Sequence, residues 1–237
     1  MITSSDENPT DTRCSARIVT DQLRLRPVVE LEPGAYGCAP QPSTGPWTAE
    51  ESETYWRACL RGGGIVGVDP ITPGSWLVPL DALRSDDLIR RVLQVHFADG
   101  SPADLDEIGP LCGGFALVDG GATLILPTCC GDLGDLDNWR AAAELRSESR
   151  EMLWIGHPWL AVWYEAPMLH IREEAECNRT APLREFAMNP EALQTAVLHA
   201  ARELDLFCER VVAALHEFPG VLDAGAVGRV LVGSLAI

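Results

Sequence analysis

The fold is decided by the stretch GGFALVDGGATLILPTCCGDLGDLDNW (residues 113–139) together with EMLWIGHPWLAVWYEAPMLHIRE (residues 151–173). Short apolar runs in these stretches are interrupted by Asp-Gly-Gly (119–121) and Glu-Ala-Pro (165–167), which suit tight hairpin turns. Strands are therefore expected at residues 115–118, 122–126, 152–155, 159–164 and 168–171. Connections this short join antiparallel strands, since parallel strands need crossovers of about a dozen residues or more. The region predicts a mainly antiparallel sheet.

Helical patterns flank this region. Thr48 and Glu51 have the spacing of a capping box and predict a helix that ends at the glycines 62–64. Apolar residues at helical spacing predict further helices at residues 81–97, 136–146 and 190–217. The alternating pattern LRLRPVVELE predicts a half-buried edge strand, and two short strands are expected at residues 65–68 and 76–78. The predicted fold class is α+β, a mainly antiparallel sheet with helices packed on one face.

The chain divides into three predicted parts. Residues 1–22 are polar and have almost nothing to bury, which predicts a disordered tail. Residues 23–217 are predicted to form a single α+β domain, a length that one hydrophobic core can support. Residues 218–237 form a C-terminal segment rich in small residues, which either docks as a strand or stays loose.

The net charge restricts the class of partner. The chain has 35 acidic and 18 basic side chains, which gives a net charge of −17 at pH 7. A surface this negative repels phosphate groups, so the composition argues against nucleic acid and against an anionic membrane. The same charge would steer a basic protein partner toward the chain, and solubility alone is the alternative explanation.

The expected location is the cytoplasm. The N-terminus is polar and acidic, with no apolar run of the signal-peptide type. No segment approaches the roughly 20 apolar residues that are required to span a bilayer. The eight cysteines do not have the spacing of a disulfide framework, so their thiols are expected to be reduced.

One cluster contains the side-chain types that bind zinc. Thiol, carboxylate and imidazole groups occur at Cys130, Asp132 and His157, which are the candidate metal ligands. Adjacent residues of an extended chain point to opposite faces, so only one of Cys129 and Cys130 would reach a given metal unless the chain turns there. The structural alternative is a buried cysteine followed by helix-capping aspartates. Apart from this zinc, no cofactor is expected.

The same cluster could supply a thiol nucleophile, with His157 as its base. The negative local charge opposes this reading because it raises the pKa of a thiol. The chain also contains no P-loop, G-x-G-x-x-G, G-x-S-x-G or H-E-x-x-H motif. A metal-binding or thiol-dependent enzyme is therefore the alternative hypothesis, and non-enzymatic binding is the leading one.

The tryptophans provide candidate binding residues. Trp159 and Trp163 share one face of a predicted strand whose other face is also apolar. Such a strand is either covered on both faces or presents one face to a partner. The candidate binding residues are Trp159, Trp163, Asp132, Asp135 and Trp139.

Two motifs carry a resemblance. The segments LILPTCCGDLGDLDNWR and MLWIGHPWLAVWYE resemble an uncharacterised bacterial family that combines a CCGDLG turn, a Trp-bearing helix and an LWIGHPW motif. That family is similar in layout, more distantly, to the SUKH superfamily of α+β domains, which often serve as immunity proteins against bacterial toxins. The resemblance implies a non-enzymatic binding role, with a basic toxin domain as the partner.

Overall fold

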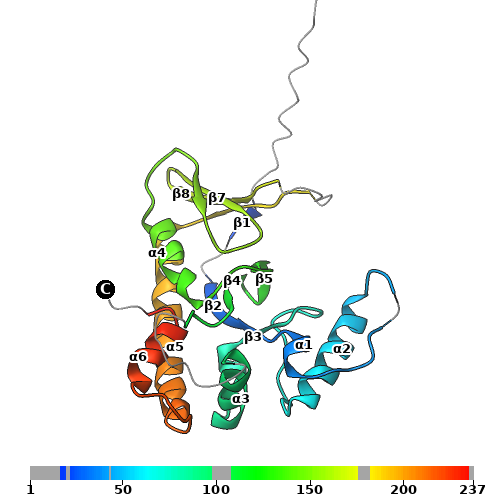
Figure 1. Cartoon of the computed structure of the whole chain (residues 1–237). Coiled ribbons are helices and arrows are strands. Elements are labelled where there is room, and N and C mark those ends of the chain that lie inside the picture. The colour runs from blue at the N-terminus through cyan, green and yellow to red at the C-terminus, as the bar shows by residue number, and fades with distance from the viewer. Residues whose placement is uncertain (1–16, 20–21, 43, 98–107, 176–181, 235–237) are drawn as a thin grey trace, which may run out of the picture.

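The computed structural model describes residues 17–19, 22–42, 44–97, 108–175 and 182–234, and Figure 1 shows how they are arranged. The fold is α+β and mostly antiparallel, as the sequence predicts. The strands of the described residues are divided between two sheets, which the local sequence patterns do not separate.

Each sheet has a simple strand order. Sheet A consists, in spatial order, of β1 (Arg17–Ile18), β9 (Glu185–Met188), β8 (Met168–Glu173), β7 (Leu160–Glu165) and β6 (Glu151–Leu153). Sheet B consists of β3 (Leu77–Pro79), β2 (Leu23–Glu30), β4 (Gly113–Asp119) and β5 (Ala122–Ile125). All described pairs are antiparallel except β1 with β9.

One long helix packs on strand β2 of sheet B and on three of the other helices. The helices are α1 (Pro33–Tyr36), α2 (Ala49–Gly62), α3 (Asp86–His96), α4 (Leu136–Glu144), α5 (Pro190–Leu215) and α6 (Ala224–Leu231). Helix α5 contacts β2, α3, α4 and α6 (Figure 1). The predicted apolar stripe on α5 is confirmed as buried core: Leu193, Val197, Ala200, Leu204, Phe207, Val211 and Leu215.

Strand β4 is buried along its whole length. Phe115 and Leu117 belong to the main core, whereas Ala116 and Val118 pack in a smaller cluster on the other face of sheet B. This alternation follows from the two-residue period of a strand. A strand covered on both faces is apolar throughout, which explains the continuous apolar run in its sequence.

The predicted start of α2 is confirmed. Thr48 Oγ1 accepts a hydrogen bond from the Glu51 main-chain N at 3.2 Å, and Glu51 Oε2 accepts one from the Thr48 main-chain N at 2.8 Å. The two bonds together satisfy donors that an uncapped helix would leave free.

Three local predictions are wrong. Strand β2, expected at a sheet edge because of Pro27, lies between β3 and β4. The helix expected from residue 81 begins at Asp86, because Ser85 caps it and accepts a hydrogen bond from the Leu88 main-chain N. Residues 80–82 form a separate 3-10 turn. Residues 65–68, expected to be a strand, are not assigned to one; Ile65 and Val68 instead anchor an irregular segment in the core.

The terminal segments also differ from expectation. Of the predicted tail at 1–22, residues 1–16, 20 and 21 lie outside the described residues. Residues 17 and 18 form β1, and Val19 is buried in the main core. The C-terminal segment forms α6 instead of a strand, because Asp223 Oδ1 caps it by accepting from the Ala226 main-chain N at 2.8 Å. The core therefore extends past both predicted domain boundaries.

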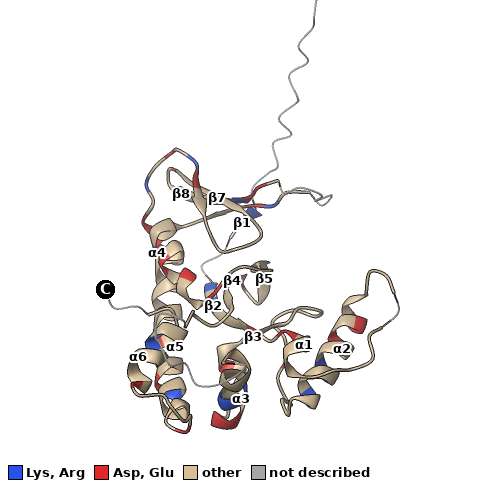
Figure 2. Ribbon diagram, viewed as in Figure 1, with Lys and Arg blue, Asp and Glu red and all other residues tan. Residues whose placement is uncertain are grey.

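The charged residues are distributed over most of the elements. Figure 2 shows Asp and Glu on several helices and loops, with Arg close to a number of them. Ion pairs such as Arg57 with Glu53 and Arg90 with Glu217 account for part of this proximity. Among the helices of the described ranges, none has the length and apolar character that crossing a membrane requires.

Candidate functional site

The two loops that carry the predicted cysteine and histidine residues lie side by side. Cys129 and His157 form an isolated antiparallel bridge. The Thr128 main-chain N donates to the His157 carbonyl at 2.8 Å, and the His157 main-chain N donates to the Cys129 carbonyl at 3.0 Å. These main-chain hydrogen bonds alone place the Cys129 and His157 side chains next to each other.

A left-handed residue turns the chain between the two cysteines. Among the described residues, Cys130 is the only non-glycine residue with a positive φ, and its φ is 62°. This backbone conformation is unfavourable for an L-residue with a side chain. The chain therefore turns between the two cysteines, which is the condition under which the sequence allowed both thiols to reach one metal.

A glycine permits the close approach of the second loop. Gly156 has a φ of 80°, and a Cβ atom at this position would lie 2.1 Å from the Cys129 carbonyl oxygen. Only glycine fits both the conformation and the space. The His157–Pro158 peptide bond that follows is cis.

The result is a cluster of two thiols and one imidazole. Cys129 Sγ lies 3.1 Å from His157 Nδ1. Ligand atoms of Cys129, Cys130 and His157 all lie within 4.8 Å of one another. Both cysteines are exposed and the histidine is half-buried. The Trp159 ring stacks on the His157 ring, with centroids 5.9 Å apart and 21° between the planes.

Asp132 is not part of this cluster, so the predicted ligand set changes. Its Oδ1 accepts from the Gly134 main-chain N at 2.7 Å, and its own main-chain N donates to Asp135 Oδ2 at 3.1 Å. The two aspartates form a capping box before α4. Of the predicted metal ligands, Cys130 and His157 come together, and Cys129 takes the place expected for Asp132.

The Asp135 side chain is hydrogen-bonded within the protein and has a structural role. It is buried, and its Oδ1 accepts from Asn138 Nδ2 at 3.1 Å. Burial raises the pKa of Asp135, the hydrogen bond from the Asp132 main chain counteracts this, and the nearby Asp132 charge adds to the rise. A buried carboxylate that is already hydrogen-bonded offers little to a partner.

The pKa of the Cys129 thiol is raised. Loss of contact with water is the first cause and the Cys130 thiol is the second, while a hydrogen bond with Thr128 acts in the opposite direction. The thiol form therefore predominates at neutral pH. The direction is the one expected, but the main causes are desolvation and Cys130, and the Glu30 charge contributes least.

The predicted aromatic binding residues occupy different environments. Trp159 has 43% of its surface exposed. Trp163 is only 8% exposed, because Arg150 lies over one side of its ring at 4.5 Å and His170 stacks on it at 5.2 Å. Trp139 is fully buried on the core-facing side of α4. The prediction that Trp139 contacts a partner directly is therefore wrong.

Two exposed residues near Trp159 are not among the predicted binding residues. Met152 is 71% exposed and Trp154 is 42% exposed, on either side of the buried Leu153. Leu153 pairs with Leu160, so Trp154 and Trp159 each adjoin the same strand pair. The sequence carries no signal for this exposure, because Met152, Leu153 and Trp154 are all apolar and no polar residue marks the outer face.

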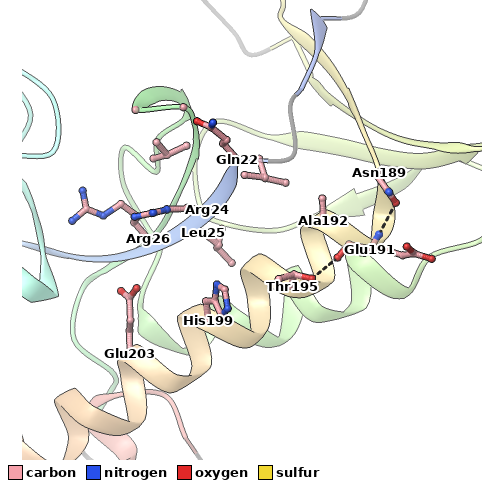
Figure 3. Close-up of a pocket in the computed structure, with 14 residues that line it drawn as sticks. Gln22, Arg24, Leu25, Arg26, Asn189, Glu191, Ala192, Thr195, His199 and Glu203 are labelled. Atoms are coloured by element: carbon pink, nitrogen blue, oxygen red, sulfur yellow. Dashed lines mark hydrogen bonds between the residues drawn. The ribbon is translucent and has the colours of Figure 1, made fainter.

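A polar groove of about 770 Å³ lies between β2 and α5. Arg24 and Arg26 line it from β2, and Thr195, His199 and Glu203 line it from one face of α5 (Figure 3). Arg26 is already paired with Asp81 through two hydrogen bonds of 2.8 and 2.9 Å. The groove has mixed charge, and its basic groups are partly neutralised.

Glu203 shows how these charges oppose one another. Burial raises the pKa of Glu203 and the Asp81 charge adds to the rise, whereas Arg26, Arg24 and His199 counteract it. The sequence signals for the groove were the alternating arginines of LRLR and the four-residue spacing along α5.

Comparisons of this chain with models of protein families, with curated proteins and with solved structures find no match. The function has to be inferred from the geometry of these residues.

Proposed function

We propose that the chain is a non-enzymatic protein-binding domain whose partner is a basic protein. The observation that carries this proposal is the set of exposed apolar side chains at the adjoining ends of β6 and β7, formed by Met152, Trp154 and Trp159. We call this group the Trp patch. Large exposed aromatic residues are enriched at the centres of protein interfaces, where their burial contributes most of the affinity.

The charge of the chain supports a basic partner. The net charge is −17, and acidic residues lie next to the Trp patch. Glu151 is exposed beside Met152, and the Glu174 main-chain N donates to the Trp159 carbonyl at 2.8 Å. An apolar centre with an acidic rim suits a partner with apolar anchors surrounded by Arg or Lys.

We assign the partner to the class of basic toxin domains, with this chain as a cytoplasmic immunity protein. The support is the resemblance of the CCGDLG and LWIGHPW motifs to a family with the layout of the SUKH superfamily, together with the acidic composition. A nuclease toxin is basic because it binds nucleic acid, and an acidic protein competes for the same charges. Asp132 and Asp135 position the loop rather than contact the partner.

If the chain is an immunity protein, a neighbouring gene should encode a basic toxin domain; the test measures the affinity of the full chain for that domain by calorimetry. We expect binding that weakens with salt, and a loss of roughly 2 kcal/mol or more in the double variant Trp154→Ala/Trp159→Ala. Leu206→Ala and Leu222→Ala are matched controls, because both side chains are exposed and apolar but lie outside the patch. Unchanged affinity in the double variant, or no binding, would contradict the proposal.

A metal- or thiol-dependent enzyme is the second candidate. The 3.1 Å contact between Cys129 Sγ and His157 Nδ1 favours it, because a nucleophile needs a base within hydrogen-bond reach. The raised pKa of Cys129 counts against it. Alkylation of Cys129 at pH 7 faster than that of the exposed Cys38 would favour the enzyme, and equal or slower alkylation would favour the binding domain.

A further inference from the structure

The two thiols and the imidazole have the chemistry of a site for a thiophilic metal ion. Thiolates and imidazoles are preferred ligands of Zn²⁺ and Cu⁺, whereas Ca²⁺ and Mg²⁺ prefer oxygen. Among the residues that the structure describes, no carboxylate belongs to the cluster, since the Asp132 side chain accepts from the Gly134 main-chain N. The donor set therefore selects against hard cations.

The distances are close to those of a coordinated ion. Zinc bonds of about 2.3 Å to sulfur and about 2.0 Å to nitrogen place tetrahedral ligand atoms roughly 3.5 to 3.8 Å apart. Cys129 Sγ and His157 Nδ1 are 3.1 Å apart, and the three ligand atoms lie within 4.8 Å of one another. Side-chain rotations are enough to close the difference, because both cysteines are exposed.

The backbone holds this arrangement at an energetic cost. Cys130 adopts a left-handed conformation that a glycine would adopt without penalty, yet the residue carries a thiol. Gly156 allows the second loop to approach, and two main-chain hydrogen bonds fix His157 beside Cys129. Such local strain concentrates at ligand sites.

The imidazole is also oriented. Its Nδ1 faces the Cys129 thiol, and its ring plane is fixed by stacking on Trp159. A ligand that is held in place before the ion arrives loses less conformational entropy on binding. The stacked tryptophan would lie close to an ion bound by His157 and could report on its arrival.

We infer that Cys129, Cys130 and His157 bind one thiophilic metal ion, Zn²⁺ or Cu⁺, through two thiolates and Nδ1. Both thiols lose their protons to solvent when the ion binds, so two protons are released for each ion. Three protein ligands leave the fourth position of a tetrahedral Zn²⁺ open to water or to an exogenous ligand. This inference does not require the proposed protein-binding function, although Trp159 belongs to the Trp patch and also stacks on His157.

The test uses the reduced full chain, freed of metal with a chelator. Zn²⁺ and Cu⁺ are titrated separately against competing chelators, and Co²⁺ is added as a spectroscopic substitute for Zn²⁺. We expect one equivalent of ion, thiolate-to-cobalt charge-transfer absorption, and a change in tryptophan fluorescence that is lost in Trp159→Phe. The affinities in the two titrations distinguish Zn²⁺ from Cu⁺.

Variants separate the site from the rest of the chain. Cys129→Ser, Cys130→Gly and His157→Ala should each lower the affinity by at least about tenfold. Cys38→Ser is the matched control, because Cys38 is an exposed thiol outside the cluster. Glycine suits the backbone at residue 130, so Cys130→Gly removes a ligand without endangering the fold.

Three results would overturn the inference. The first is an affinity no stronger than that of the Cys129→Ser/Cys130→Gly double variant. The second is an unchanged affinity in Cys130→Gly. The third is a disulfide between Cys129 and Cys130 that persists under reducing conditions, because it would remove both thiolates. Toxin binding by the Cys130→Gly variant should match that of the unmodified chain, so the two proposals can fail separately.

Discussion

Arg184 holds the carboxylate of Glu173, which is fully buried in β8. Arg184 Nε donates to Glu173 Oε1 at 3.0 Å, and the Arg184 main-chain N donates to Oε2 at 3.1 Å. The guanidinium also packs over the Phe186 ring of β9 at 5.7 Å. A single arginine thus links a buried charge to the pairing of β8 with β9.

Replacing Arg184 should destabilise the protein. Arg184→Ala is expected to lower the free energy of unfolding by about 3 kcal/mol, because it removes a guanidinium that donates hydrogen bonds to a buried carboxylate. Arg202→Ala, at an exposed position on α5, should change it by less than about 0.5 kcal/mol. Urea denaturation followed by circular dichroism measures both. Equal effects of the two substitutions would contradict the assigned role of Arg184.

The left-handed turn predicts opposite effects for two substitutions of Cys130. Cys130→Gly should raise the free energy of unfolding by up to about 1 kcal/mol, because glycine adopts a φ of 62° without penalty. Cys130→Val should lower it by about 1 kcal/mol or more, since a β-branched residue is least compatible with this conformation. Thermal melts of the metal-free protein compare the two. A lower melting temperature for the glycine variant would contradict the prediction.

The contact between the two loops depends on Gly156. Gly156→Ala would place a Cβ atom 2.1 Å from the Cys129 carbonyl oxygen, so the loops must separate. We expect a loss of about 2 kcal/mol or more in the free energy of unfolding, together with weaker metal binding. Gly34→Ala is the control, because a Cβ atom there has no described atom within 4 Å. If both variants unfold at the same urea concentration, the close approach of Gly156 to the Cys129 carbonyl does not limit the residue type at position 156.

The environment of His96 predicts a loss of stability in mild acid. Burial lowers the pKa of His96, and a hydrogen bond with the Gly109 main chain partly offsets this. Because the folded pKa lies below the unfolded one, the contribution of His96 is complete above about pH 6.5 and is lost as the pH falls through the folded pKa. Between pH 7.5 and pH 5, the His96→Gln variant should therefore lose less free energy of unfolding than the unmodified chain. Urea denaturation midpoints at the two pH values measure both losses. Equal losses in the two proteins would exclude this effect.

Local sequence patterns predicted the helices and strands that are specified by residues close to one another in the chain. The capping box at Thr48 and the apolar stripe of α5 were both predictable, because capping and helical spacing depend on nearby residues. The division of the strands between two sheets was not predictable, because pairing joins residues far apart in the chain. Strand β9 was missed because four residues directly before a helix cap give too short a pattern.

The candidate site was predicted in part. Residue types identified Cys130 and His157, but the choice between Cys129 and Asp132 depended on a turn that a cysteine rarely makes. The burial of Trp139 could have been anticipated, because it shares a face of α4 with Leu136 and Ala143. The burial of Trp163 could not have been anticipated, because the residues that cover its ring, Arg150 and His170, come from other segments of the chain.

Strand β1 has a practical consequence for anyone who shortens this chain. It is only two residues long, yet it closes the edge of sheet A by pairing with Phe186 and Ala187 of β9. Deleting residues 1–22 would uncover that edge, and an unprotected edge is a template for strands of other molecules. Trimmed versions of the protein should retain Arg17 and Ile18 if they are to stay free of aggregates.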